Sequence, residues 1–180
     1  VLERQFIAFC FDNWIRSGVD ETAIPKHLDK VLFNVASKVD ETFPFNYLKF
    51  VQKNLTSFFQ RFVSLFASEI DGQTIHELQA FVKGDGLQKT PLQNRILRIF
   101  NEMNQEIEGL NENIKILDKL LLEYKTKTAD SSYDEEKEKL QHEKQALLNV
   151  KREIRRKDLF NFLSDEGLLP NYAFPEEGIT

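Results

Sequence analysis

Apolar positions recur at steps of three and four residues along most of the chain, which is the pattern of helices that bury one face. Residues 2–17 are apolar around nearly the whole helical circumference and predict a largely buried helix. Residues 27–38 predict a second, short helix, and residues 45–70 predict a long helix with a wide apolar stripe and Thr42 as a candidate cap. The fold class predicted from this pattern is all-α.

A change in the pattern separates the first half of the chain from the second. Thr74 and Glu77 have the spacing of a capping box, which predicts a short helix that ends near Lys83. The glycines that follow, up to residue 89, interrupt the helical pattern and favour a boundary there. Residues 1–89 are therefore expected to form a helical globular part.

The second half carries a heptad pattern. Thr90 and Pro91 have the residue types of a helix cap and a first helical turn, and the apolar steps beyond them alternate between four and three residues for about four heptads. A helix over residues 91–127 would be about 55 Å long, which is longer than a globular core requires. The positions of this stripe are Ile96, Phe100, Met103, Ile107, Leu110, Ile114, Leu117, Leu121 and Tyr124.

A polar segment at residues 128–134, with Ser132 and Glu135 in capping-box spacing, predicts a turn into a second long helix over residues 134–163. Short connections of this kind join antiparallel neighbours, so residues 90–163 are predicted to form an antiparallel coiled-coil hairpin. Parallel dimerisation through either helix is the competing arrangement, and the pattern leaves it open. The second helix offers a thinner stripe, made of Leu140, Leu147, Val150 and Ile154.

The charge of the chain does not indicate a nucleic-acid-binding protein as a whole. Its 180 residues carry a net charge of −5, and both halves are mildly acidic, so any contact with DNA or RNA would have to be local. One basic cluster could bind phosphates, or it could be a solvated helix face that pairs with Glu106, Glu108 or Glu112. The cluster consists of Lys151, Arg152, Arg155, Arg156 and Lys157.

No catalytic residue and no metal site is expected in this chain. The single cysteine, Cys10, excludes a disulfide framework and a thiolate-rich metal centre, and the three histidines lie far apart in the sequence. Residues 83–90 contain glycines, lysine and threonine but lack the spacing of a nucleotide-binding loop. The chain shows neither an apolar run of membrane-spanning length nor the pattern of a signal peptide, so we expect a cytoplasmic protein without a membrane partner.

The last residues carry the motif that bears most on function. The string FLSDEGLLPNYAFP, within residues 158–175, resembles a segment of large bacterial superfamily 2 helicases of the DEAD/DEAH-box type. In that family the segment follows the two motor lobes and leads to a C-terminal domain. The matching positions are Gly167, Leu169, Pro170, Tyr172, Phe174 and Pro175.

The resemblance implies an accessory, non-catalytic helical domain within an ATP-dependent DNA or RNA helicase. ATP and Mg²⁺ would bind the motor of the parent chain, whose motifs this sequence lacks, and the partners would be the rest of that chain and nucleic acid. Residues 164–180 would be an extended docking segment that leads into a further domain. The interdomain contact would involve Leu169, Pro170, Tyr172, Phe174 and Pro175.

A second interpretation is a non-enzymatic scaffold or adaptor whose coiled coil binds a protein partner. The helicase hypothesis requires motor motifs upstream of Val1 in the parent chain, as expected if the 180 residues are a segment of a longer protein. The scaffold hypothesis requires no such motifs, and it predicts self-association or a helical partner at the heptad stripe.

Overall fold

The computed structural model of the chain describes residues 2–66, 68–84, 89–126 and 133–170. These residues contain helices and no β-strand, which confirms the predicted all-α class. One isolated antiparallel bridge within them joins His27 to Asp158. The helices are α1 (Leu2–Arg16), the 3₁₀ helix η1 (Glu21–Ala23), α2 (Leu28–Ser37), α3 (Phe45–Lys53), α4 (Leu55–Leu65), α5 (Gly72–Lys83), α6 (Pro91–Thr126), α7 (Asp134–Arg156) and α8 (Leu159–Asp165).

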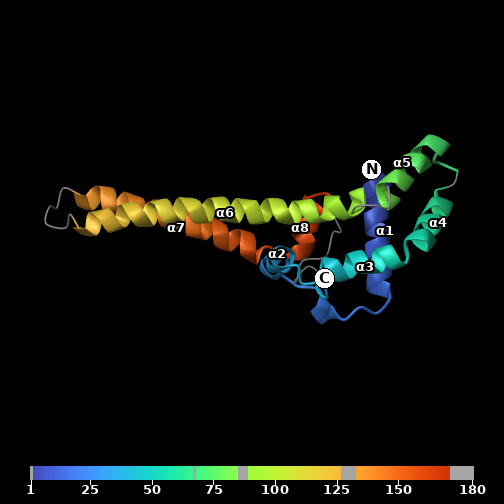
Figure 1. Cartoon of the computed structure of the whole chain (residues 1–180), viewed down its shortest axis with the longest axis horizontal. Helices are drawn as coiled ribbons and strands as arrows, with labels where there is room; N and C mark the ends of the chain where they lie inside the picture. The colour runs from blue at the N-terminus through green and yellow to red at the C-terminus, as the bar shows by residue number, and fades with distance from the viewer. Residues whose placement is uncertain (1, 67, 85–88, 127–132, 171–180) are drawn as a thin grey trace, which may run out of the picture.

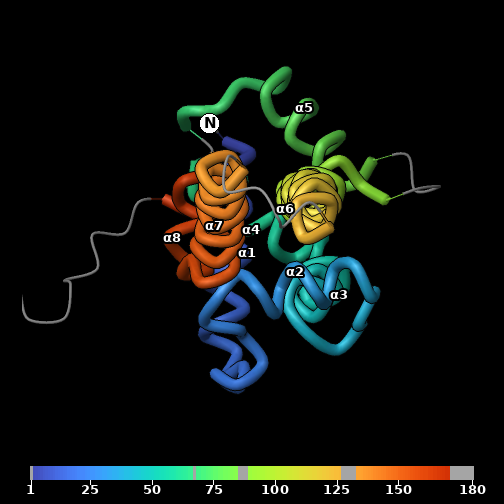
Figure 2. The backbone as a smooth tube through the Cα atoms, turned by 90° about the vertical axis from the view of Figure 1, so that its left-hand side faces the viewer, coloured from blue at the N-terminus to red at the C-terminus, as the bar shows by residue number. Residues whose placement is uncertain are grey.

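Two long helices dominate the shape of the molecule (Figure 1). α6 and α7 run antiparallel, side by side, and extend away from the other helices. α1, α3, α4 and α5 gather at the opposite end, where α6 begins, and α2 and α8 lie where α7 reaches this helical body. Figure 2 looks along the long axis of the molecule and shows α6 and α7 next to each other, with α2 and α3 below α6.

The hydrophobic core forms around α1, which is largely buried, as its apolar circumference predicts. Trp14 of α1 stacks on Phe43 with 5.9 Å between the ring centroids, and Phe43 meets Phe100 of α6 edge to face at 6.2 Å. The Phe100 ring lies 5.8 Å from the ring of Phe162 in α8. This line of aromatic contacts joins the beginning, the middle and the end of the chain in one core.

The long helix predicted over residues 45–70 is divided into two helices, α3 and α4, which meet at Asn54. The Asn54 backbone has φ −108° and ψ 14°, outside the helical region, and its side-chain amide donates to the Phe50 carbonyl at 2.9 Å. An asparagine side chain that bonds the nearby backbone in this way competes with helix propagation. The second helix also ends at Leu65, five residues before the predicted end, so the prediction of one continuous helix was wrong.

The short helix predicted near residue 74 is α5, and its cap is Asp71 rather than Thr74. The Asp71 carboxylate accepts the Thr74 amide hydrogen at 2.8 Å, and hydrogen bonding with the side chain and the amide of Thr74 lowers the pKa of Asp71 below its ordinary value of 3.8. The predicted capping box of Thr74 and Glu77 is therefore wrong, because Thr74 already lies inside the helix.

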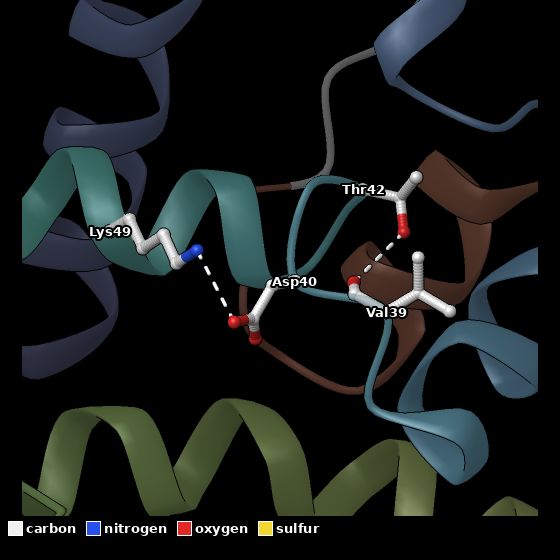
Figure 3. Close-up of polar contacts among 4 residues, drawn as sticks. All are labelled: Val39, Asp40, Thr42 and Lys49. Carbon is white, nitrogen blue, oxygen red and sulfur yellow. Dashed lines mark hydrogen bonds and ion pairs between the residues drawn. The ribbon is translucent and has the colours of Figure 1, made fainter.

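Two local polar contacts lie along the connection between α2 and α3 and at the start of α3 (Figure 3). The Thr42 hydroxyl donates to the Val39 carbonyl at 3.2 Å, and Lys49 lies 3.5 Å from Asp40 in an exposed ion pair. Pro44 occupies the cap position of α3, so the predicted capping by Thr42 is wrong. Since exposed ion pairs stabilise proteins little, the conformation of this connection depends mainly on the burial of Phe43.

The second long helix ends at Arg156 and not at residue 163 as predicted. Lys157 adopts an extended backbone, and the Asp158 carboxylate then caps α8 by accepting the Asn161 amide hydrogen at 3.0 Å. Two backbone hydrogen bonds of 2.9 Å fix this junction to the start of α2, from the Leu28 amide to the Lys157 carbonyl and from the Leu159 amide to the Lys26 carbonyl. The sequence pattern missed the break because the partner segment, residues 26–28, lies far away in the sequence.

Candidate functional site

The part of the α6–α7 pair that extends beyond the core, residues 107–126 and 134–154, is the most prominent feature of the surface and is called the arm here. On α6, every one of the nine apolar positions of the predicted stripe is buried or half-buried. The first of them, Ile96 and Phe100, belong to the core, while Ile114 and Leu117 are buried within the arm. The apolar stripe of α6 therefore packs in the core over its first positions and against α7 over its later ones.

The face that α7 turns inward differs from the prediction. No residue of α7 is fully buried, and Val150, predicted for the inner stripe, is 41% exposed. Its place is taken by Lys151, which is half-buried. Along one heptad series of α7, half-buried aliphatic residues alternate with half-buried lysines, which the prediction overlooked although the seven-residue spacing of the lysines is visible in the sequence. The series consists of Lys137, Leu140, Lys144, Leu147, Lys151 and Ile154, and Leu148 beside it is half-buried as well.

Polar contacts connect the two helices across the arm. The Lys144 ammonium lies 2.6 Å from the Asp118 carboxylate, and both side chains are partly shielded from solvent. Near the tip, the Tyr124 hydroxyl donates to the Glu136 carboxylate at 2.7 Å and the Tyr124 ring lies 5.7 Å from the Tyr133 ring. The hydrogen bond to Glu136 raises the pKa of Tyr124. These contacts fix the register of the two helices in a pair with few buried apolar groups.

A groove follows one side of the arm between the two helices. Its lining combines leucines with lysines and glutamines, so the groove offers hydrophobic surface together with positive charge. It is lined by Asp118, Leu121, Leu122, Lys125, Lys137, Gln141, Lys144, Gln145 and Leu148.

The basic cluster predicted at residues 151–157 does not form one free surface. Lys151 is half-buried on the inner side of α7, and Lys157 lies 2.7 Å from the Asp165 carboxylate and over the Phe162 ring. The other three members are exposed, and within the described residues they form no ion pair, so the alternative of pairing with Glu106, Glu108 or Glu112 is not realised there. They are Arg152, Arg155 and Arg156.

The predicted docking segment begins inside the protein's own core. Gly167 has φ 76° and ends α8, after which Leu168 and Leu169 are both buried. The Arg4 guanidinium donates to the Leu169 carbonyl at 2.9 Å, and Pro170 is exposed. Tyr172, Phe174 and Pro175, the other residues predicted for the interdomain contact, lie outside the described residues.

The remaining chemical groups serve structural roles. The Cys10 thiol is buried, and this burial strongly raises its pKa, so a reactive thiolate is disfavoured. Gly84 ends α5 with φ 56°, and the Thr90 hydroxyl accepts the Gln93 amide hydrogen at 3.2 Å, as the predicted cap requires. The two described ends of the glycine-containing segment therefore act as helix caps.

Comparisons with known proteins find no relative of this chain. No family model matches the chain, and no curated protein and no solved structure matches it. Within residues 2–66, 68–84, 89–126 and 133–170, no group of three or more histidine, cysteine, aspartate or glutamate side chains is arranged to hold a metal ion. The helices of the same ranges include none that is long and apolar enough to cross a membrane.

Proposed function

We propose that the chain is a non-catalytic accessory module of an ATP-dependent nucleic-acid helicase, in which the arm is an antiparallel coiled-coil hairpin. The observation that carries the proposal is the resemblance of residues 158–175 to superfamily 2 helicases of the DEAD/DEAH-box type. The burial of Leu168 and Leu169 supports it, because the segment that would lead to the next domain is then anchored in the helical module.

In this proposal the module braces the motor lobes against the C-terminal domain. Pro170, Tyr172, Phe174 and Pro175 dock on the parent chain, while Leu169 anchors the segment on the module side. The motor of the parent chain binds ATP and Mg²⁺, and this chain contributes no group to that chemistry. The complete protein would act in the cytoplasm on DNA or RNA.

The exposed arginines near the base of the arm, Arg152, Arg155 and Arg156, are the groups best suited to guide a nucleic-acid strand. A few arginine contacts with phosphates give an affinity that is independent of sequence and falls steeply with salt. The half-buried Lys151 and the paired Lys157 contribute less, because their ammonium groups are shielded or already neutralised.

Fluorescence anisotropy with labelled single-stranded, duplex and forked DNA tests this guiding role. We expect the chain to bind at low salt, and we expect the triple variant Arg152→Glu, Arg155→Glu, Arg156→Glu to lose this binding. The matched control is Lys53→Glu, Lys115→Glu, Lys119→Glu, which changes the net charge equally at exposed lysines elsewhere. Absence of binding at low salt, or equal loss in both triple variants, would refute the guiding role.

A non-enzymatic scaffold that binds a protein through the arm is the second candidate. The observation that favours it is the apolar surface left uncovered on the arm, where Ile116 is 55% and Leu122 62% exposed. This function needs no motor in the parent chain. Sequencing the parent gene upstream of Val1 separates the two candidates, because the helicase requires motor motifs there.

A further inference from the structure

We propose that the groove of the arm binds an acidic amphipathic helix of a protein partner. This inference goes beyond the accessory role, because it names the class of partner and holds whether or not the parent chain is a helicase. It depends on the charge of the groove, on the leucines in its lining and on its position between two helices.

The charge of the groove is positive. Three lysines line it against a single carboxylate, Asp118, which Lys144 already neutralises at 2.6 Å. The other two, Lys125 and Lys137, form no ion pair within the described residues. An acidic partner would supply the missing charge, and such complementarity determines both the orientation of a partner and its rate of association.

Part of the lining of the groove is aliphatic. Leu121 and Leu148 are half-buried there, and Leu122 is 62% exposed. Leucine surface in contact with water favours a partner that removes it from solvent. The partner must therefore present apolar side chains between its acidic groups, which is the pattern of an amphipathic segment.

Two parallel ridges with a groove between them suit a third helix. An amphipathic helix can place residues i, i+3, i+4 and i+7 along such a groove, with its acidic flanks toward the lysines of the lining. A nucleic acid fits less well, because sequence-independent binding of single strands combines phosphate contacts with stacking on aromatic rings. The groove offers lysines, but the described residues that line it include leucines and no aromatic residue.

Binding of a designed probe peptide to the 180-residue chain tests the proposal. The probe is a labelled helical peptide with leucines at i, i+3, i+4 and i+7 and glutamates on both flanks, and its control peptide carries lysines in place of the glutamates. Fluorescence anisotropy is expected to detect binding of the acidic peptide and not of the basic one. Leu122→Ser and the double variant Lys125→Glu, Lys137→Glu should each weaken this binding about tenfold or more.

Matched controls on other faces of the arm make the test specific. Ile116→Ser removes a similarly exposed aliphatic side chain outside the groove, and Lys115→Glu with Lys119→Glu reverses the charge of two exposed lysines outside it. Both are expected to leave the affinity unchanged. Leu122 and Lys125 are exposed, whereas Lys137 is half-buried at an inner position of α7, so the helical circular dichroism of each groove variant is compared with that of the unsubstituted chain before its affinity is measured.

Four results would overturn the proposal. The first is failure of the unsubstituted chain to bind the acidic peptide, and the second is equal affinity in the groove variants and the controls. The third is binding of a single-stranded oligonucleotide that the lysine variant abolishes and Leu122→Ser preserves, which would make the groove a phosphate site. The fourth is a dimer in sedimentation analysis that Leu122→Ser converts to a monomer, which would make a second copy the occupant.

Discussion

Gly167 determines where the chain goes after its last described helix. With φ at 76°, it lets the Leu168 amide donate to the Leu163 carbonyl at 2.9 Å, and both leucines that follow then enter the core. A residue with a Cβ rarely adopts this backbone conformation, although the space around the position is open. The anchoring of the C-terminal segment therefore depends on the absence of one methyl group.

Alanine substitution at two glycines should have opposite effects on stability. Gly167→Ala is expected to lower the free energy of unfolding by about 1 kcal/mol, because the left-handed conformation is strained for alanine. Gly109→Ala lies in the interior of α6 with open space around it and should raise the free energy of unfolding by about 0.5–1 kcal/mol. Urea denaturation followed by circular dichroism measures both, and changes of the same sign would contradict this explanation.

At the scale of the helices, α6 and α7 contribute unequally to the arm. α6 has buried residues along the arm, whereas α7 has none and places a lysine at every second inner position. The aliphatic part of a lysine side chain can cover apolar surface while its ammonium group reaches water. α7 can therefore pack against α6 through these lysines, but it buries less apolar surface than leucines would. The arm is therefore expected to be less stable than the core, and we expect α6 and α7 to separate locally before the core unfolds.

Replacing one inner lysine by leucine tests this interpretation of α7. Lys151→Leu should raise the stability of the arm by about 1 kcal/mol, since the half-buried position would gain an aliphatic side chain. Lys139→Leu, at an exposed position of the same helix, is the control and should have little effect. Hydrogen exchange of the α6 amides between residues 107 and 117 provides the measurement. Faster or unchanged exchange in Lys151→Leu would show that the ammonium group itself stabilises the pair.

Periodicity predicted the existence of the helices well and their ends less well. The stripe of α6 was predicted position by position, because a helical face that must leave water repeats in the sequence. The breaks at Asn54 and Lys157 were missed, because a side-chain hydrogen bond causes the first and pairing with residues 26–28 causes the second. The groove was missed as well, since it depends on which residues of two helices come together.

At the scale of the whole molecule, the core is closed by residues from both ends of the chain. α8 contributes Leu159, Phe162 and Leu163, all buried, to a core that begins with α1. The single tryptophan, Trp14, lies 3% exposed in the middle of it and reports on its integrity. The arm, by contrast, contacts water on most of its surface.

Removing the arm should leave the core folded. In a variant whose residues 114–147 are replaced by a short glycine and serine turn, we expect the Trp14 emission maximum to stay unchanged while helical circular dichroism falls. Deletion of residues 158–180 is the contrasting variant. It should shift the Trp14 emission to longer wavelength, because the core loses the three buried residues of α8. The opposite pair of results would mean that the arm, and not α8, completes the core.

The junction at Lys157 also makes the arm mechanically asymmetric. On one side α6 continues without interruption into the core, so a force at the tip reaches the core through a single stiff rod. On the other side α7 stops at Arg156, and the load passes through the covalent backbone into α8 and through two backbone hydrogen bonds to the start of α2. The arm is thus a lever with one continuous root and one jointed root, and tension along α7 would pull on α8 and on the start of α2 together.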